Sequence, residues 1–201
     1  PIETVILGQA QSSSNKTSTA IAPTHTFALN IEDYPFLKSH VIDAKAVLPV
    51  AIYTEWFAHA ALHANPGLHY LGIDDLRVYK GVRIEEHETL NLAVVADKLE
   101  TINGTQSVRV AMYSGTDWST LHARGTVRLN TKYEVSTPSI PDTPLGDYSR
   151  PMDEVYANGL LFHGEVFRGI ESVSGYSESG IDVLAHPAPA PTQWITKPLR
   201  R

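Results

Sequence analysis

One segment of this chain has the length and composition of a central buried helix, and regularly alternating runs follow it. Val50–His63 places apolar residues at helical spacing, with Pro49 acceptable at a helix start and Pro66-Gly67 as a stop. Three later runs alternate between apolar and polar residues as half-buried strands do: Leu90–Ala96, Val108–Met112 and Leu121–Leu129. Asn103-Gly104 lies between the first two and indicates a hairpin, because both residues tolerate positive φ. One long helix followed by antiparallel strands predicts a sheet wrapped around that helix.

The chain divides into four segments by composition. Residues 1–24 read as a short strand, Ile2–Leu7, followed by a linker rich in Ser, Thr and Asn, and residues 25–135 contain the helix and the strands. Residues 136–149 form a proline-rich, extended linker. Residues 150–201 begin a second unit, with a helix within Met152–Leu161 and two strands, Phe167–Tyr176 and Ile181–Leu184. The predicted class is α+β, with a complete first unit and a partial second one.

Composition removes several classes of function. The net charge is −6 and no basic stripe is present, which excludes a nucleic-acid-binding surface. The absence of cysteine excludes disulfides, a thiolate nucleophile and cysteine-ligated zinc. No apolar run approaches the ~18 residues of a membrane span, and no secretory leader opens the chain. Glycine-rich dinucleotide and phosphate loops are missing. We therefore expect a cytoplasmic protein without a membrane, nucleic-acid, metal or cofactor partner.

His40 is the sharpest candidate for chemistry. It stands at the start of an apolar run that ends at Pro49, in the spacing His-x8-Pro, directly before the predicted helix. An imidazole at the edge of an apolar pocket suits a general base that moves a proton on an acyl chain. The alternative is an ordinary structural histidine beside an apolar run.

Two motifs resemble those of the dehydratase domains of polyketide and polyunsaturated fatty-acid synthases. His40–Pro49 resembles the family signature His-x3-Gly-x4-Pro, and Asp33–Leu37 resembles its lead-in Asp-x-Pro-[Trp/Phe]-Leu. Leu161–Ile170 is similar to the second signature, Tyr-Gly-Pro-x-Phe-Gln-Gly, in a Leu-Phe-His-Gly form. The resemblance extends over about residues 25–201. A degenerate or truncated member of the family would also fit these motifs.

The resemblance implies a double hot-dog fold, in which two curved antiparallel sheets each wrap a long helix. It also implies the removal of water from 3-hydroxyacyl thioesters of an acyl-carrier protein, giving 2-enoyl thioesters. His40 then matches the general base, and the acid, an aspartate of the second helix, is expected beyond Arg201. The expected substrate-binding residues are Pro49, Phe162, His163, Gly164 and Phe167. The expected partners are an acyl-carrier protein with its phosphopantetheine-bound acyl chain and the neighbouring synthase domains. The resemblance is also compatible with a homodimer.

Several features oppose an active dehydratase. Ala44 stands where the family has glycine, Glu165 where it has proline, and Arg168 where it has glutamine, although Glu165 and Arg168 are placed to pair locally. Asp182 is a poor acid candidate, because its predicted strand has no helix after it. A non-catalytic acyl-binding or structural module of the same ancestry is therefore the main alternative. A stand-alone hot-dog thioesterase is a more remote one.

Glu55, His59 and His63 share a helix face at i, i+4 and i+8, as the ligands of zinc-binding helices do. His-Glu-x2-His is absent, and no further ligands with suitable spacing follow. We expect these three side chains to face solvent. His163 has two interpretations, lining the pocket or hydrogen-bonding a backbone carbonyl.

Overall fold

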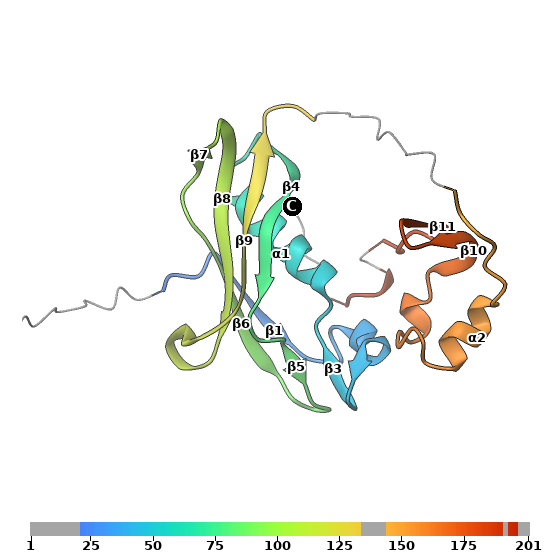
Figure 1. Cartoon of the computed structure of the whole chain (residues 1–201). Helices are drawn as coiled ribbons and strands as arrows, with labels where there is room; N and C mark the ends of the chain where they lie inside the picture. The colour runs from blue at the N-terminus through green and yellow to red at the C-terminus, as the bar shows by residue number, and fades with distance from the viewer. Residues whose placement is uncertain (1–20, 134–143, 191–192, 197–201) are drawn as a thin grey trace, which may run out of the picture.

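The computed structural model describes residues 21–133, 144–190 and 193–196 (Figure 1). Its main sheet is antiparallel, in the order β1-β6-β8-β9-β4, with β7 paired to β8. The strands are β1 (His25–Leu29), β4 (His69–Val78), β6 (Leu90–Ala96), β7 (Glu100–Ile102), β8 (Thr105–Ser114) and β9 (Thr120–Asn130). Asn103 and Gly104 join β7 to β8 with φ of 50° and 79°, which confirms the predicted hairpin.

Helix α1 (Val50–His63) has the predicted bounds and lies against one face of this sheet, in contact with β4, β6, β8 and β9 (Figure 1). Trp56 stacks on Phe27 of β1 with ring centroids 4.2 Å apart. The buried Tyr53 hydroxyl accepts a hydrogen bond of 3.1 Å from the Val82 N–H. The helix is therefore the centre of the core, and a curved antiparallel sheet around a central helix is the hot-dog architecture that was expected.

A smaller sheet leads into α1. It has the order β2-β3-β5, with β2 (Val41–Ile42), β3 (Lys45–Val47) and β5 (Arg83–Ile84), and the short 3-10 helix η1 (Pro35–Ser39) precedes it. Asp43 and Ala44 form the β2–β3 turn, with φ of 51° and 59°. Both φ values are positive, as in a type I′ hairpin, where glycine is favoured at the second position. Ala44 therefore occupies a backbone conformation that disfavours its side chain.

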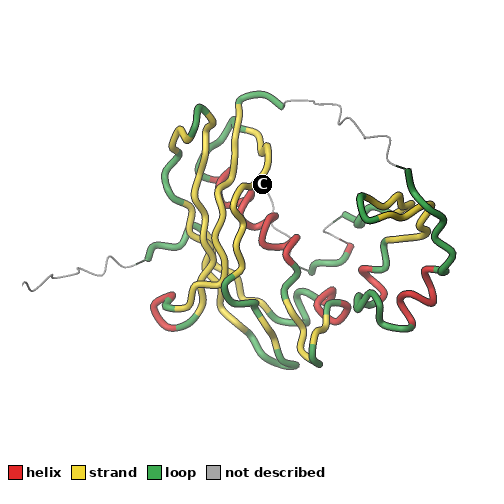
Figure 2. Tube along the Cα trace, in the orientation of Figure 1, coloured by secondary structure: helices red, strands yellow, loops and turns green. Residues whose placement is uncertain are grey.

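The second part of the chain is a helix and a hairpin with a core of their own (Figure 2). Its elements are α2 (Met152–Ala157), the 3-10 helix η3 (Glu165–Phe167), β10 (Ile170–Ser177) and β11 (Gly180–Ala185). Met152, Val155 and Tyr156 of α2 are buried there and pack against Ile170 and Val173 of β10. This part corresponds to the beginning of a second hot-dog unit.

The structure corrects some predicted bounds. Helix α2 ends at Ala157 and not near Leu161, because the Gly159 N–H bonds the Tyr156 carbonyl and the Leu160 N–H bonds the Val155 carbonyl, which is a Schellman ending. The next strand begins at Ile170, because Glu165–Phe167 forms η3. Strand β4 and the short strands of the small sheet had not been predicted, nor had the 3-10 helix η2 (Thr116–Trp118). The predicted strand at 2–7 and most of the linker at 136–149 lie outside the described residues.

Candidate active site

The local backbone orients the ring of His40. The Val47 N–H donates to the His40 carbonyl at 2.9 Å, so the last residue of β3 pairs with the residue just before β2. The same Val47 presents its carbonyl oxygen 2.8 Å from His40 Nδ1. A carbonyl only accepts, so Nδ1 carries the proton and donates it there. The lone pair of Nε2 is then the basic site of a half-buried imidazole.

The second motif docks directly onto the residue before His40. The Gly164 N–H donates to the Ser39 carbonyl at 2.8 Å, and the Val166 N–H donates to Ser39 Oγ at 3.4 Å. A Cβ on Gly164 would lie 2.8 Å from Ser39 Cα, which is closer than real Cβ atoms approach backbone. Glycine at 164 is therefore required for close contact rather than for an unusual φ. These contacts join the two motifs, although more than a hundred residues separate them.

Docking surrounds His40 with rings, which we call the His40 cluster: His40, Phe162, His163 and Phe167. The centroids of the Phe162, His163 and Phe167 rings lie 5.0, 5.6 and 5.9 Å from that of His40. His163 also stacks on Phe162 at 4.2 Å. The cluster gives the His40 ring an aromatic, partly water-excluding environment on one side.

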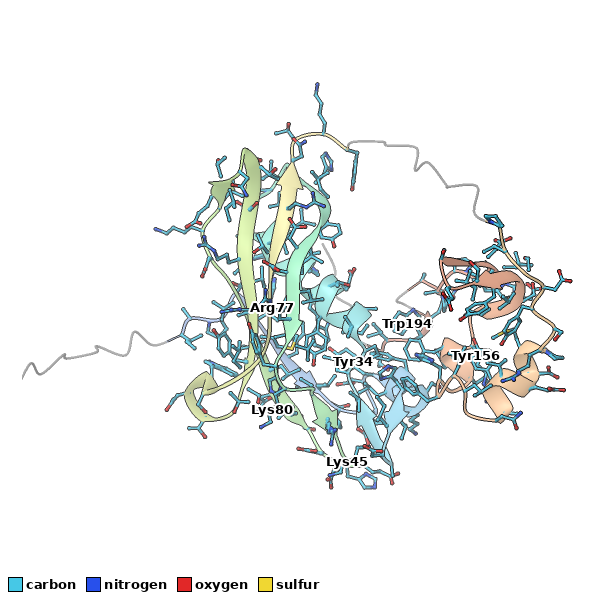
Figure 3. All side chains as sticks on the ribbon, in the orientation of Figure 1. Tyr34, Lys45, Arg77, Lys80, Tyr156 and Trp194 are labelled. Atoms are coloured by element: carbon cyan, nitrogen blue, oxygen red, sulfur yellow. The ribbon has the colours of Figure 1, made fainter. Side chains whose placement is uncertain are left out.

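Trp194 extends the cluster toward the core. Trp194 is labelled in Figure 3. Its ring meets Phe36 of η1 edge to face at 4.8 Å and lies 6.5 Å from the ring of Phe167. Thr196 donates its N–H to the Asp33 carbonyl at 3.0 Å, which brings the segment after β11 back to the first unit. This contribution had not been predicted, because an isolated tryptophan in a proline-rich segment carries no spacing signal.

The charges around the cluster favour a neutral second histidine. Partial burial lowers the pKa of His163, and the nearby His40 lowers it further. Arg168 lies over the Tyr156 ring, 5.5 Å from its centroid, and makes no ion pair with Glu165 in the described structure, so the predicted local pair is wrong. His163 makes no hydrogen bond to a backbone carbonyl in the described part of the chain, and its role in lining a pocket stays a prediction.

Other predicted site residues lie elsewhere. Pro49 is buried and is the N-cap of α1, two residues beyond Val47. Asp182 is exposed on β11, where it pairs with Gly175. A hollow of about 600 Å³ opens along the β2–β3 hairpin next to the cluster, lined by residues such as Lys38, Val41 and Ile84, but His40 does not line it.

The histidines of α1 acquire a partner that the sequence did not reveal. His25 of β1 places its ring 4.8 Å from that of His63 and 5.5 Å from that of His59, while Glu55 remains exposed. The expectation of solvent-facing side chains is therefore wrong for His59, which is half-buried. Burial lowers the pKa of His25, and His63 and His59 lower it further.

Within the described ranges, no group of three or more side chains is arranged to hold a metal ion. Over those same ranges, none of the helices has the length and apolarity that crossing a bilayer requires.

Known proteins resemble this chain in sequence and in fold. The family described as polyketide synthase dehydratase domain matches residues 6–115. One subunit of the polyunsaturated fatty acid synthase of Thraustochytrium sp. is 25% identical over 182 residues, covering 87% of this chain and 6% of that protein. The solved dehydratase domain from the CurK module of curacin polyketide synthase has a TM-score of 0.57 and 20% identity, over 75% of this chain and 54% of that one. A histidine-to-phenylalanine variant of the PpsC dehydratase domain of Mycobacterium tuberculosis has a TM-score of 0.57 and 19% identity, over 85% and 61%. The chain thus spans a small part of the curated relative and little more than half of these solved domains.

Proposed function

Because this chain belongs to the polyketide synthase dehydratase domain family, we propose that it removes water from 3-hydroxyacyl thioesters carried by an acyl-carrier protein, with His40 as the general base. It would do so as part of a multidomain polyketide or polyunsaturated fatty-acid synthase. The observation that carries the proposal is the hydrogen bond from His40 Nδ1 to the Val47 carbonyl, because it fixes the tautomer that leaves Nε2 basic.

The reaction needs a base beside the α-carbon of the acyl chain. His40 Nε2 takes the α-proton, the electrons of that C–H bond form the new C=C bond, and the β-carbon–oxygen bond breaks. The first-turn N–H groups of α1, directly after Pro49, would polarise the thioester carbonyl and so acidify the α-proton. The departing hydroxyl leaves as water once an acid has given it a proton, and we assign that acid to an aspartate beyond Arg201.

Two variants of one solved relative support this division of roles. A variant of the CurK dehydratase with one histidine changed to phenylalanine is described as inactive, and so is a variant with one aspartate changed to asparagine. Phe162, His163, Gly164 and Phe167 would then contact the acyl chain, because they come from the segment that docks beside His40.

A non-catalytic module is the second candidate. The rings of Phe162 and His163 lie directly against His40, and Arg168 turns toward Tyr156 instead of the cluster. Such a module would bind or shape the acyl chain without removing water from it.

One experiment separates the two candidates. A 3-hydroxyacyl acyl-carrier protein is offered to the chain extended to include the proposed aspartate, and formation of the 2-enoyl thioester is followed by absorbance and mass. His40→Ala should lower the rate by about 10²–10⁴-fold, the range of a general base. His87→Ala is the matched control, because the His87 side chain is 83% exposed. Conversion by wild type and His40→Ala at equal rates would remove His40 from the site. Binding of the acyl chain without any conversion would favour the non-catalytic module.

A further inference from the structure

Residues 193–196, which we call the return segment, bind the first unit just before η1. Thr196 donates its N–H to the Asp33 carbonyl at 3.0 Å and its hydroxyl to the Glu32 carbonyl at 3.3 Å. Both acceptors belong to the turn that leads into η1. Trp194 is partly buried and packs against the core of the first unit. The return segment therefore contacts η1 through its backbone and through an aromatic side chain.

The indole of Trp194 is held in one orientation. Its Nε1–H donates to the Pro189 carbonyl at 2.7 Å, which fixes the direction of the ring and leaves no unpaired polar atom on it. The ring meets Phe36 of η1 with centroids 4.8 Å apart and planes at 73°. Phe36 is only 1% exposed, so the indole contacts a side chain that is fixed in the core.

Helix η1 connects this contact to the proposed base. It has five residues, long for a 3-10 helix, so it depends on its surroundings for stability. His40 is its C-cap and donates its N–H to the Leu37 carbonyl at 3.1 Å. At the same end, the Gly164 N–H bonds the Ser39 carbonyl. Helix η1 is therefore held by the return segment at its start and by the second motif at its end.

We propose that Trp194 is a positioning residue for His40. The return segment holds η1 in place, and η1 keeps the His40 ring where Nδ1–H bonds the Val47 carbonyl and Nε2 is left basic. In the described structure Trp194 makes no ring contact with His40, so it acts through Phe36 and Phe167. The inference rests on the proposed function and deepens it, because it names what fixes the orientation of the base.

The first test measures the tautomer of His40 in the 201-residue chain and does not depend on turnover. The ¹⁵N resonances of a neutral imidazole show which nitrogen carries the proton, at a pH well above the ordinary histidine pKa of about 6.5. Wild type should hold the proton on Nδ1, because the Val47 carbonyl accepts it. Trp194→Ala should shift His40 toward the tautomer mixture of a solvated imidazole. Trp194→Phe keeps a ring against Phe36 and should restore the wild-type tautomer.

Two further variants sharpen this test. Trp118→Ala is the matched control, because Trp118 lies in η2 and makes no ring contact in the part of the chain that the structure describes. It should leave the tautomer of His40 unchanged. Thr196→Pro removes the N–H that bonds Asp33 and keeps the indole, so it should shift the tautomer in the same direction as Trp194→Ala. It also tests the return segment if Trp194→Ala does not fold.

The second test measures turnover of a 3-hydroxyacyl acyl-carrier protein by the chain extended to include the proposed aspartate. Trp194→Ala should lower kcat by up to about 10²-fold, the cost of misplacing a catalytic group by about 1 Å. KM should change little, because the indole packs against η1 and not against the acyl chain. Trp194→Phe should recover most of kcat. A loss of stability alone would lower the amount of folded protein without this difference between kcat and KM.

The outcomes separate this inference from the proposed function. If folded Trp194→Ala and Thr196→Pro keep the wild-type tautomer of His40, the inference is wrong, whatever their activity. If the tautomer shifts but kcat does not, the positioning role in the reaction is refuted. If the wild-type extended chain forms no enoyl thioester while the tautomer still depends on Trp194, the proposed function fails and only the orientation of the ring by the return segment stands.

Discussion

The turn between β2 and β3 allows a stability prediction in the motif that holds His40. Asp43 and Ala44 have φ of 51° and 59°, and both side chains are exposed. A left-handed conformation costs an L-residue about 1–2 kcal/mol, and glycine avoids that cost. Glycine loses more backbone entropy on folding, which costs roughly 0.5–1 kcal/mol. Ala44→Gly should therefore raise the free energy of unfolding by about 0.5–1 kcal/mol.

Calorimetric melting of the full chain measures the effect. In a domain of this size, 1 kcal/mol moves Tm by about 2–4 °C, so we expect a rise of roughly 1–4 °C. Ala51→Gly is the matched control, because Ala51 is also exposed but lies in the first turn of α1, where glycine lowers helix stability. A lower Tm for Ala44→Gly, of the kind expected for Ala51→Gly, would refute the claim that the turn is strained.

Three further predictions follow from buried or tightly packed groups. Tyr53→Phe should lower the free energy of unfolding by about 1–3 kcal/mol in urea titration, because it leaves the buried Val82 N–H without its acceptor. Gly164→Ala should loosen the docking on Ser39 and lower Tm, with a change in tryptophan fluorescence, because the added methyl would lie 2.8 Å from Ser39 Cα. Burial lowers the pKa of His122, so below the ordinary value of about 6.5 the unfolded chain binds more protons than the folded chain. The free energy of unfolding should therefore fall as pH drops through that value, by at most about 1.4 kcal/mol per pH unit. His122→Gln should reduce this dependence of the unfolding free energy on pH, as measured by urea titration at several pH values.

Each of these predictions has a control in the same chain. Tyr176→Phe changes an exposed tyrosine and should leave stability nearly unchanged. Gly81→Ala adds a methyl with nothing within 4 Å, so a loss as large as that of Gly164→Ala would contradict the contact argument. The wild-type chain measured over the same pH range is the reference for His122→Gln. An identical slope in wild type and His122→Gln would show that His122 does not carry the effect.

The elements that the sequence predicted are those whose signal lies within a few neighbouring residues. The helix Val50–His63 and the Asn103-Gly104 hairpin depend on local spacing and turn chemistry, and the structure confirms both. Strand β4 was missed because its register shifts twice, around Gly72 and between Asp74 and Arg77, which destroys the alternation. The end of α2 was misplaced although Asn158-Gly159 is an ordinary helix stop.

In the candidate site, too, the features with a local sequence signal were predicted and those that depend on long-range contacts were not. The His40 motif and the segment around His163 were recognisable separately, but nothing local shows that the Ser39 carbonyl would bond the Gly164 N–H. The Val47 acceptor was also invisible, because it is a backbone atom. The contact of Trp194 with Phe36 depends on a return of the chain that no pattern encodes.

The contact between Ser39 and the segment at Gly164 sets an order of assembly. The partners at Ser39 and Val166 are 127 residues apart, so the enclosure of His40 waits until the segment at Val166 has been synthesised. Once the sheet has formed, closing the stretch from Asn130 to Gly164 still costs roughly 3 kcal/mol of loop entropy, more than one neutral hydrogen bond returns. The aromatic packing must supply the difference. A nascent chain therefore holds its imidazole open to water until the segment at Gly164 has emerged and docked on Ser39.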